Sequence, residues 1–221
     1  MIKKFLNIIM LSFKGYSTLR SFQILECENI TLSGKCIEFG AVDGGKKNFS
    51  YYFKGEPKYF YSNIDKRNSK NYIQLDLTKK LKLKNKSFNN VIFLNVLEHL
   101  PNINIAFKEL ERVLKKNGHL IGSTPFIYQV HGAPNDYYRF SKDFFIKKFN
   151  KKKYKSVKII PLGFGPFVAS YSLIFPLFKI LPIFKEIILS ICFVMDSIVQ
   201  IFVKTNLNEI YPVGYFFKIK K

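Results

Sequence analysis

One pattern constrains the fold of this 221-residue chain more than any other: from residue 34 to about 160, short apolar runs alternate with segments of helical length. That alternation is typical of β-α-β units, in which helices join parallel strands. It predicts an α/β fold with a Rossmann-like, doubly wound, mostly parallel sheet. The expected strands are 36–39, 59–63, 91–94, 119–123 and 157–160, with a final strand at 213–219.

Two helices of this core carry clear boundary signals. Between the third and fourth strands, apolar residues recur at spacings of three and four from Ile103 to Leu114, after Pro101 and before Asn117-Gly118. These signals predict a helix that ends at Asn117. A second helix is expected to begin after Ser141, whose hydroxyl suits an N-cap.

The composition changes beyond Pro161. Residues 161–203 are overwhelmingly apolar and are broken by four prolines, and no unbroken run reaches the ~20 residues that span a bilayer. The first residues have the basic head and short apolar run of a secretion signal without its cleavage site, so an amphipathic helix is predicted there. The expected organisation is an N-terminal helical segment (1–33), an α/β core (34–160), an apolar helical insertion before the last strand (161–210) and a closing strand of the core (211–221).

The insertion needs an apolar surface to cover it. It can pack against the core, form a homodimer, or lie in a membrane interface, where Lys179, Lys185 and Lys204 would meet lipid phosphates. The sequence leaves these alternatives open.

Charge and cysteine content limit the partners. The net charge is +21, from 36 Lys+Arg and 15 Asp+Glu, yet four of the basic residues are arginines. Since arginine dominates phosphate and base recognition, nucleic acid is disfavoured as a partner. The three cysteines are widely spaced and form no C-x-x-C pair, which argues against disulfides and zinc and favours a reducing cytoplasm. No metal ligands are predicted.

Glycines and acids follow the expected strands. Gly40, Gly44 and Gly45 lie where the first strand turns toward a helix, and Asp65 follows Gly44 by 21 residues, a position suited to ribose hydroxyls in doubly wound folds. Asp76 is expected where the next strand ends, near an adenine edge. The glycines lack the G-x-G-x-x-G spacing of a dinucleotide-binding dehydrogenase, which disfavours that class.

Three motifs are more specific: V-L-E-H-L at 96–100, R-V-L-K-K-N-G at 112–118 and S-T-P-F at 123–126. With them the chain resembles the class I S-adenosylmethionine-dependent methyltransferases over about residues 34–160 and the closing strand. The resemblance implies an enzyme of this fold with S-adenosylmethionine as cofactor. The cofactor-binding residues it implies are Glu38, Gly40, Asp43 and Gly44 in the first loop, Asp65 at the ribose, Asp76 and Leu77 at the adenine, and Asn95 beneath the sulfonium, while Glu98 and His99 lie near the mouth or cap the next helix.

One residue departs from the family pattern. Val42 stands where the family commonly has glycine, and a β-branched residue resists positive φ. Either the loop takes a different path or cofactor affinity is reduced, and a non-catalytic homologue is the corresponding alternative.

The loop after the fourth strand is rich in chemically active side chains. In open α/β sheets ligands bind at this edge, so we expect the loop to cover the acceptor pocket. His131 is the leading proton acceptor and Asp136 the second, since imidazole titrates near neutrality. His99, Tyr137, Tyr138 and Arg139 are the expected substrate-binding residues. In the alternative, the loop is a rigid connection in which Arg139 pairs with Asp136 and the tyrosines pack.

The predicted function is therefore methyl transfer from S-adenosylmethionine to a small, sugar or lipid-linked acceptor, in cell-envelope glycan or lipid synthesis. The predicted location is the cytoplasm, with peripheral contact to the inner face of the membrane through 161–210 as one reading. RNA methylation, suggested by the charge, and a degenerate non-catalytic protein are the alternatives.

Overall fold

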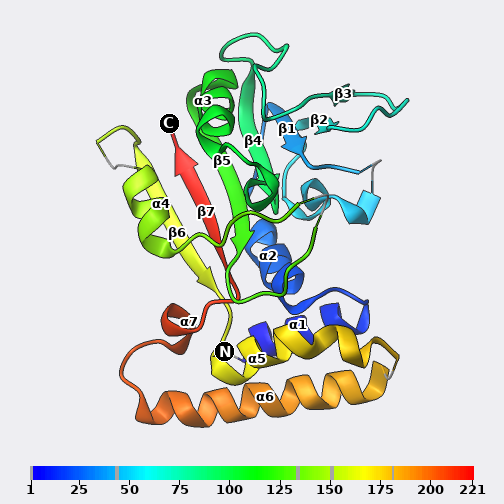
Figure 1. Ribbon diagram of the computed structural model, residues 1–221, viewed down its shortest axis with the longest axis vertical. Helices are drawn as coiled ribbons and strands as arrows, with labels where there is room; N and C mark the ends of the chain where they lie inside the picture. The colour runs from blue at the N-terminus through cyan, green and yellow to red at the C-terminus, as the bar shows by residue number, and fades with distance from the viewer. Residues whose placement is uncertain (1, 43–44, 133–134, 150–151, 181) are drawn as a thin grey trace. The chain divides into compact units, whose positions relative to one another are not determined.

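A seven-stranded sheet carries the fold, in the computed structural model of residues 2–42, 45–132, 135–149, 152–180 and 182–221 (Figure 1). Its strand order is β3-β2-β1-β4-β5-β7-β6. The strands are β1 (Lys35–Phe39), β2 (Lys58–Asn63), β3 (Tyr72–Gln74), β4 (Phe88–Leu94), β5 (Leu114–Pro125), β6 (Ser156–Leu162) and β7 (Gly214–Lys220).

The sheet is parallel from β3 to β5. β1 pairs in parallel with β2 on one side and β4 on the other, so the winding reverses beside β1. Strand β7 runs antiparallel to both neighbours: Val213 N–H donates to Leu162 O, and Lys221 N–H donates to Gly118 O. This mixed, doubly wound order confirms the predicted fold class, and the reversal beside β1 is where such sheets bind ligands.

The helices and 3₁₀ turns divide between connections within the sheet and the apolar segment. They are α1 (Ile2–Phe13), α2 (Thr18–Glu28), α3 (Ile103–Val113), α4 (Lys142–Lys148), α5 (Pro166–Ile174), α6 (Pro182–Phe202) and α7 (Leu207–Ile210), with 3₁₀ turns η1 (Gly45–Lys47), η2 (Phe49–Tyr52), η3 (Leu97–His99) and η4 (Phe175–Ile180).

Helix α3 forms where predicted but ends earlier. The Asn102 side chain caps it by accepting from Asn104 N and Ile105 N, so neither Glu98 nor His99 is its cap. The helix ends at Val113 because Leu114 is already extended and pairs with Phe88 of β4. The predicted end at Asn117 is therefore wrong. The prediction for α4 is confirmed, since the Ser141 hydroxyl accepts from Phe144 N.

The chain divides into two compact units. The helical unit comprises Met1–Leu25, Pro125–Val130 and Pro161–Tyr215, and the sheet unit comprises Glu26–Thr124, His131–Ile160 and Phe216–Lys221. The apolar segment that begins at Pro161 thus shares a unit with the N-terminal helix α1.

Arg112, from the R-V-L-K-K-N-G motif, has a structural role in the sheet unit. Its guanidinium donates to both oxygens of Glu109, at 2.6 to 3.1 Å, and to the carbonyls of Leu81 and Leu83. The Glu109 carboxylate also accepts from Leu81 N at 2.8 Å. The pair therefore fixes the loop that follows β3 onto α3.

Helix α6 of the helical unit buries its charged residues and exposes apolar ones, the reverse of an ordinary surface helix. Its three charged residues, Lys185, Glu186 and Asp196, are all buried. Lys185 donates to Ser12 O at 2.8 Å, and Asp196 accepts from the first amides of α5. The exposed face is apolar: Phe184, Ile187, Ile191, Val194, Met195, Ile198, Ile201 and Phe202.

This arrangement corrects one expectation. The Lys185 ammonium is buried inside the helical unit and cannot contact lipid phosphates, whereas Lys204 is exposed. Within the described ranges, no helix combines the length and apolarity that crossing a bilayer requires.

Candidate functional site

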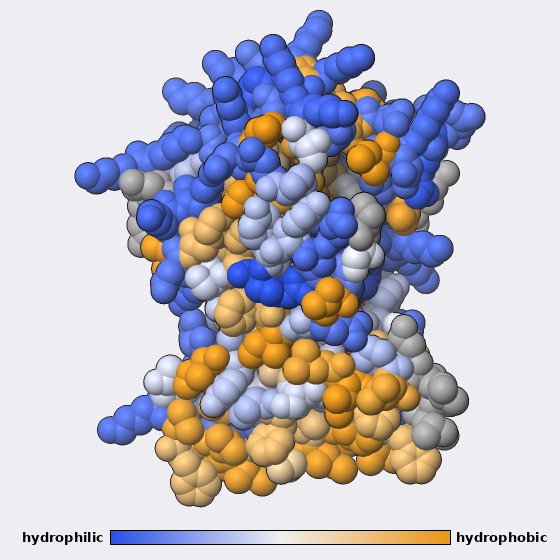
Figure 2. Space-filling model, in the orientation of Figure 1, coloured by the Kyte–Doolittle hydropathy of each residue, from blue (hydrophilic) through white to orange (hydrophobic). Residues whose placement is uncertain are grey.

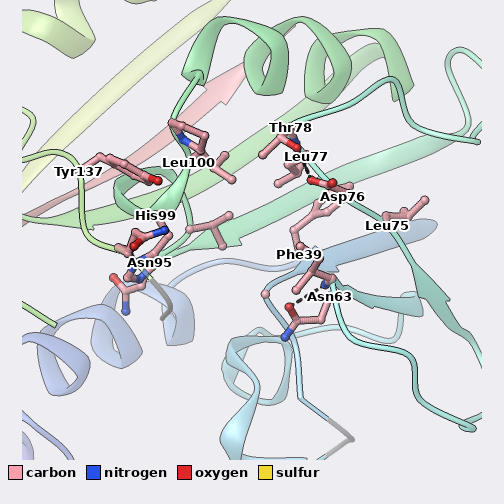
Figure 3. A pocket seen from close by; sticks show the side chains of 15 residues that line it. Phe39, Asn63, Leu75, Asp76, Leu77, Thr78, Asn95, His99, Leu100 and Tyr137 are labelled. Atoms are coloured by element: carbon pink, nitrogen blue, oxygen red, sulfur yellow. Dashed lines mark hydrogen bonds between the residues drawn. The ribbon is translucent and has the colours of Figure 1, made fainter. Parts of the chain in front are cut away.

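A cavity of about 380 Å³ opens in the sheet unit, where β1, β2 and β4 end. Two sides are distinguishable in Figure 3: Asn63 and Asp76 lie on one, and Asn95, His99 and Tyr137 lie on the other. The complete lining is Phe39, Gly40, Asn63, Ile64, Leu75, Asp76, Leu77, Thr78, Asn95, Val96, His99, Leu100, Pro101, Asn135 and Tyr137.

Gly40 forms the turn directly after β1. Its φ is +73°, and a Cβ there would lie 2.8 Å from Val96 Cγ2. Both the left-handed backbone and this contact exclude a side chain. Gly40 therefore brings bare backbone to the cavity, as predicted for the cofactor loop.

The path of the loop beyond Gly40 explains the valine at position 42. The side-chain amide of Asn48 makes two hydrogen bonds with the backbone of Val42: it accepts from the N–H at 2.8 Å and donates to the carbonyl at 2.9 Å. Val42 is absent from the residues with positive φ, so it carries no left-handed strain, and it does not line the cavity. Asp43 and Gly44, both predicted cofactor residues, lie outside the described residues.

Glu38 stabilises the same loop through hydrogen bonds to its backbone. Its buried carboxylate accepts from Phe49 N at 2.8 Å and Ser50 N at 3.0 Å, which satisfies the first amides of η2. Glu38 is not among the lining residues of the cavity. It positions the turn after β1, and its predicted direct contact with cofactor has no support in this geometry.

The residue at the end of β2 that lines the cavity is an asparagine and not the predicted aspartate. Strand β2 ends at Asn63, which lines the cavity, while Asp65 lies two residues farther on, is exposed and is not part of the lining. The Asn63 amide donates to Ala41 O at 3.2 Å and accepts from Ile64 N at 2.8 Å. The prediction for Asp65 is therefore corrected: Asn63 occupies the strand-end position.

Asp76 lines the cavity as predicted, next to Leu77. Its Oδ1 accepts from Thr78 N at 2.9 Å and from the Thr78 hydroxyl at 2.6 Å, and its Oδ2 lies 3.3 Å from Lys79 Nζ. Burial disfavours the charged form, but the hydrogen bonds from Thr78 and the ammonium of Lys79 outweigh it and lower the pKa of Asp76. The cavity wall thus contains an ionised carboxylate whose Oδ2 accepts no hydrogen bond from Thr78.

Asn95 follows β4 in a left-handed conformation, with φ +55°. Asparagine tolerates this region better than most residues do. Its N–H donates to Ser123 O at 2.8 Å on the neighbouring strand. The turn places Asn95 in the cavity wall, where the resemblance predicted it.

His99 and Tyr137 form the opposite wall. His99 Nδ1 lies 2.6 Å from Asn135 O, and Tyr137 N–H donates to Glu98 O at 2.7 Å, so the loop that follows β5 is fastened to η3. Tyr137 is 48% exposed. These two predicted substrate residues stand where a ligand could enter from solvent.

Three other residues of that loop do not line the cavity. Arg139 pairs with both oxygens of Asp136, at 2.5 and 2.7 Å. The Tyr138 hydroxyl donates to Pro101 O, and its ring stacks on Phe140. The alternative of a rigid connection is thus confirmed for this pair and for Tyr138.

Asp136 is the partner of His131 and not a proton acceptor. The hydrogen bonds from Arg139 hold the pKa of Asp136 far below its usual range despite burial. His131 also lies outside the cavity lining; its Nδ1 is 3.2 Å from Asp136 Oδ2, and its ring centroid is 5.0 Å from that of His99. The prediction for Asp136 as a base is corrected, because a carboxylate held so tightly accepts no proton near neutrality.

The sequence did not indicate that the Glu98 carboxylate is buried beside His99 and His131. The carboxylate is fully buried, and burial raises the pKa of Glu98 to about 8, with the negative charge of Asp136 adding to the effect. Asn63, Thr78 and Phe39 were also missed. Asn63 could have been found as the last residue of an alternating strand, whereas the burial of Glu98 has no local sequence signal.

Comparisons with known proteins agree with this geometry. Residues 57–122 match the family model described as a methyltransferase domain. No curated protein matches the chain in sequence.

Solved structures share the fold at low identity. A phosphoethanolamine N-methyltransferase 2 of Haemonchus contortus, in complex with S-adenosyl-L-methionine, matches with 13% identity and TM-score 0.56, over 90% of this chain and 52% of that one. This chain thus spans about half of that protein. A possible histamine N-methyltransferase of Thermotoga maritima matches with 14% identity and TM-score 0.57, over 95% and 91% of the two chains. A methyltransferase of Archaeoglobus fulgidus matches with 14% identity and TM-score 0.54, over 96% and 94%.

Proposed function

We propose that the chain is a class I S-adenosylmethionine-dependent methyltransferase, since residues 57–122 match a methyltransferase domain and the sheet has the fold of such enzymes. It would transfer the methyl group of this cofactor to a small, sugar or lipid-linked acceptor that enters beside His99 and Tyr137. The observation that carries the proposal is the cavity at the reversal of the sheet. Bare backbone at Gly40 and a carboxylate at Asp76 lie on its walls.

The lining supports one orientation of the cofactor. Asp76 Oδ2 can accept from the adenine amino group, between the apolar side chains of Leu75 and Leu77. Asn63 offers an amide at the end of β2, the position suited to ribose hydroxyls. Gly40 and Asn95 would hold the methionine part, which would leave the wall that contains His99 to the acceptor.

The chemistry asked of the protein is modest. When bound, S-adenosylmethionine would supply an electrophilic methyl group to an acceptor atom held in line with its carbon–sulfur bond, and the electron pair of the broken bond would remain on sulfur. A hydroxyl acceptor must also release its proton. Positioning and exclusion of water therefore matter more than a covalent nucleophile, and the proton must be managed by groups at the His99 wall.

The exposed face of α6 supports an acceptor at a membrane surface. Figure 2 shows hydrophobic residues gathered over the helical unit, where α6 lies. Every charged residue of α6 points inward, and the chain carries a net charge of +21. An apolar face on a basic protein fits the interface of an anionic bilayer. We therefore place the enzyme at such a surface, with a lipid-linked acceptor as the finer proposal.

Calorimetric titration with S-adenosylmethionine and S-adenosylhomocysteine tests the central proposal. We expect one site per chain with micromolar affinity for both. Failure of either compound to bind at millimolar concentration would refute the proposal and leave a non-catalytic homologue.

Vesicle sedimentation tests the membrane surface. We expect the protein to sediment with anionic phosphatidylglycerol vesicles and not with phosphatidylcholine alone. Ile191→Asn with Ile198→Asn should abolish sedimentation without unfolding, because both side chains are 52% exposed. Unchanged sedimentation of this variant, or its conversion from dimer to monomer in analytical ultracentrifugation, would contradict lipid docking.

A further inference from the structure

Glu98, His99 and His131 bring three ligand atoms together behind the His99 wall, all within 4.8 Å of one another. We propose that they bind a divalent transition-metal ion, which holds and activates an oxygen of the acceptor. This inference rests on the proposed function for its role in catalysis, but binding of the metal itself does not.

Glu98 supplies the strongest argument. Its carboxylate is 0% exposed, and neither oxygen accepts a hydrogen bond from another described residue. Its Oε1 lies 3.8 Å from His99 Nε2 and 3.9 Å from His131 Nε2, which is too long for hydrogen bonds. A buried carboxylate without such partners is costly, and a coordinated cation between these atoms removes that cost.

His99 is oriented to coordinate. Its Nδ1 lies 2.6 Å from the carbonyl of Asn135, and a carbonyl can only accept. Nδ1 therefore donates to this carbonyl, which leaves Nε2, on the side of the ring toward Glu98, as the atom that can coordinate. A backbone carbonyl behind an imidazole is the usual partner of a metal-binding histidine.

His131 also turns its Nε2 toward Glu98, at 3.9 Å from Oε1. Its Nδ1 faces Asp136 Oδ2 at 3.2 Å, and the Asp136 carboxylate is fixed by Arg139 and by the His131 backbone N–H. The tightly held Asp136–Arg139 pair thus becomes the support of a ligand.

Two imidazoles and one carboxylate suit Zn²⁺, Mn²⁺, Fe²⁺ or Co²⁺ and leave coordination positions open. Ligand atoms about 2.1 Å from such an ion are about 3 to 3.5 Å apart, so the observed separations close with a small inward movement of the side chains. An acceptor oxygen in an open position would lose its proton to water more readily, because the ion lowers its pKa. His131 would then be a ligand and not the base.

The chain offers a matched control. It has three histidines, and the third, His119, lies on β5 with Nδ1 3.2 Å from Asn90 Oδ1, away from the cluster. Untagged, chelator-treated protein is titrated with Co²⁺ alone, and binding is followed by visible d–d absorption and equilibrium dialysis. We expect one ion per chain, an affinity reduced about 100-fold in His131→Gln and in Glu98→Gln, and no change in His119→Gln.

The cofactor is titrated in parallel with the same proteins. Because His131 does not line the cavity, His131→Gln should bind S-adenosylhomocysteine as the wild type does. Absence of stoichiometric Co²⁺ binding, or equal binding by His131→Gln, overturns the metal site whatever the cofactor result. Metal binding in a protein that fails to bind cofactor would sustain the site and refute the methyltransferase function.

Discussion

Replacing Asp76 by Asn tests the proposal that its Oδ2 accepts a hydrogen bond from the adenine amino group. The Asn side chain keeps an oxygen that accepts from Thr78 N and the Thr78 hydroxyl. Its amide nitrogen replaces the second carboxylate oxygen, so a hydrogen-bond donor would face the adenine amino group, which is also a donor. Losing a hydrogen bond to a charged acceptor costs about 1.5 to 3 kcal/mol. Since 1.4 kcal/mol is about tenfold in affinity, the Kd for S-adenosylhomocysteine should rise about 10- to 150-fold.

The assay is calorimetry at constant salt, with the melting temperature of each variant measured beside it. Asp65→Asn is the matched control: it removes the same charge from an exposed position outside the cavity lining and should change the Kd by less than about twofold. An unchanged Kd for Asp76→Asn, or an equal loss for Asp65→Asn, would refute the assignment of the adenine site.

Three further perturbations have defined outcomes. Gly40→Ala should lose cofactor binding, since the methyl group would meet Val96 in a backbone at φ +73°, a strain of about 1 to 3 kcal/mol; calorimetry measures it. Arg112→Met should destabilise the fold by about 2 to 4 kcal/mol in urea, because Glu109 is left buried without its partner. Burial and two lysines of β7 lower the pKa of His119 from 6.5 to about 4, so the unfolded chain binds a proton that the fold does not, and stability should fall by about 2 kcal/mol as the pH drops from 6.5 to 4.

Each has a control. Gly15→Ala carries a similar backbone strain, at φ +87°, but its Cβ would meet nothing and it lies outside the cavity lining, so cofactor binding should stay intact. Adding Glu109→Gln to Arg112→Met should recover part of the lost stability, and no recovery would argue against the buried-pair explanation. His119→Gln should flatten the acid dependence; an unchanged slope would assign it to other groups.

Local signals predicted the elements of the sheet unit well. Alternating apolar runs gave the strands, and the Ser141 hydroxyl marked the start of α4. The end of α3 was placed wrongly because Gly118 suggested a helix terminus, while pairing of Leu114 with Phe88 decided it. Strand pairing is a long-range contact that helix signals do not report.

The site was predictable where residue identity and strand order suffice. Gly40, Asp76 and Asn95 lie in the cavity because each follows a strand whose end the sequence marks. The predicted strand 59–63 ends where β2 ends, but Asp65, chosen because it is the next acid, lies two residues beyond that end and outside the cavity lining. Whether Asp136 acts as a base or as a support depended on Arg139, whose side chain could equally have pointed to solvent.

By itself the sequence determined the α/β class, the edge of the sheet at which the cavity opens, and the apolar nature of the segment after Pro161, because periodicity and strand polarity are properties of consecutive residues. Only the tertiary structure decided that α6 turns its charges inward, that Asn63 and not Asp65 lines the cavity, and that Glu98 is buried beside two imidazoles. Burial and juxtaposition arise from contacts between distant parts of the chain, and these are fixed when the whole core packs.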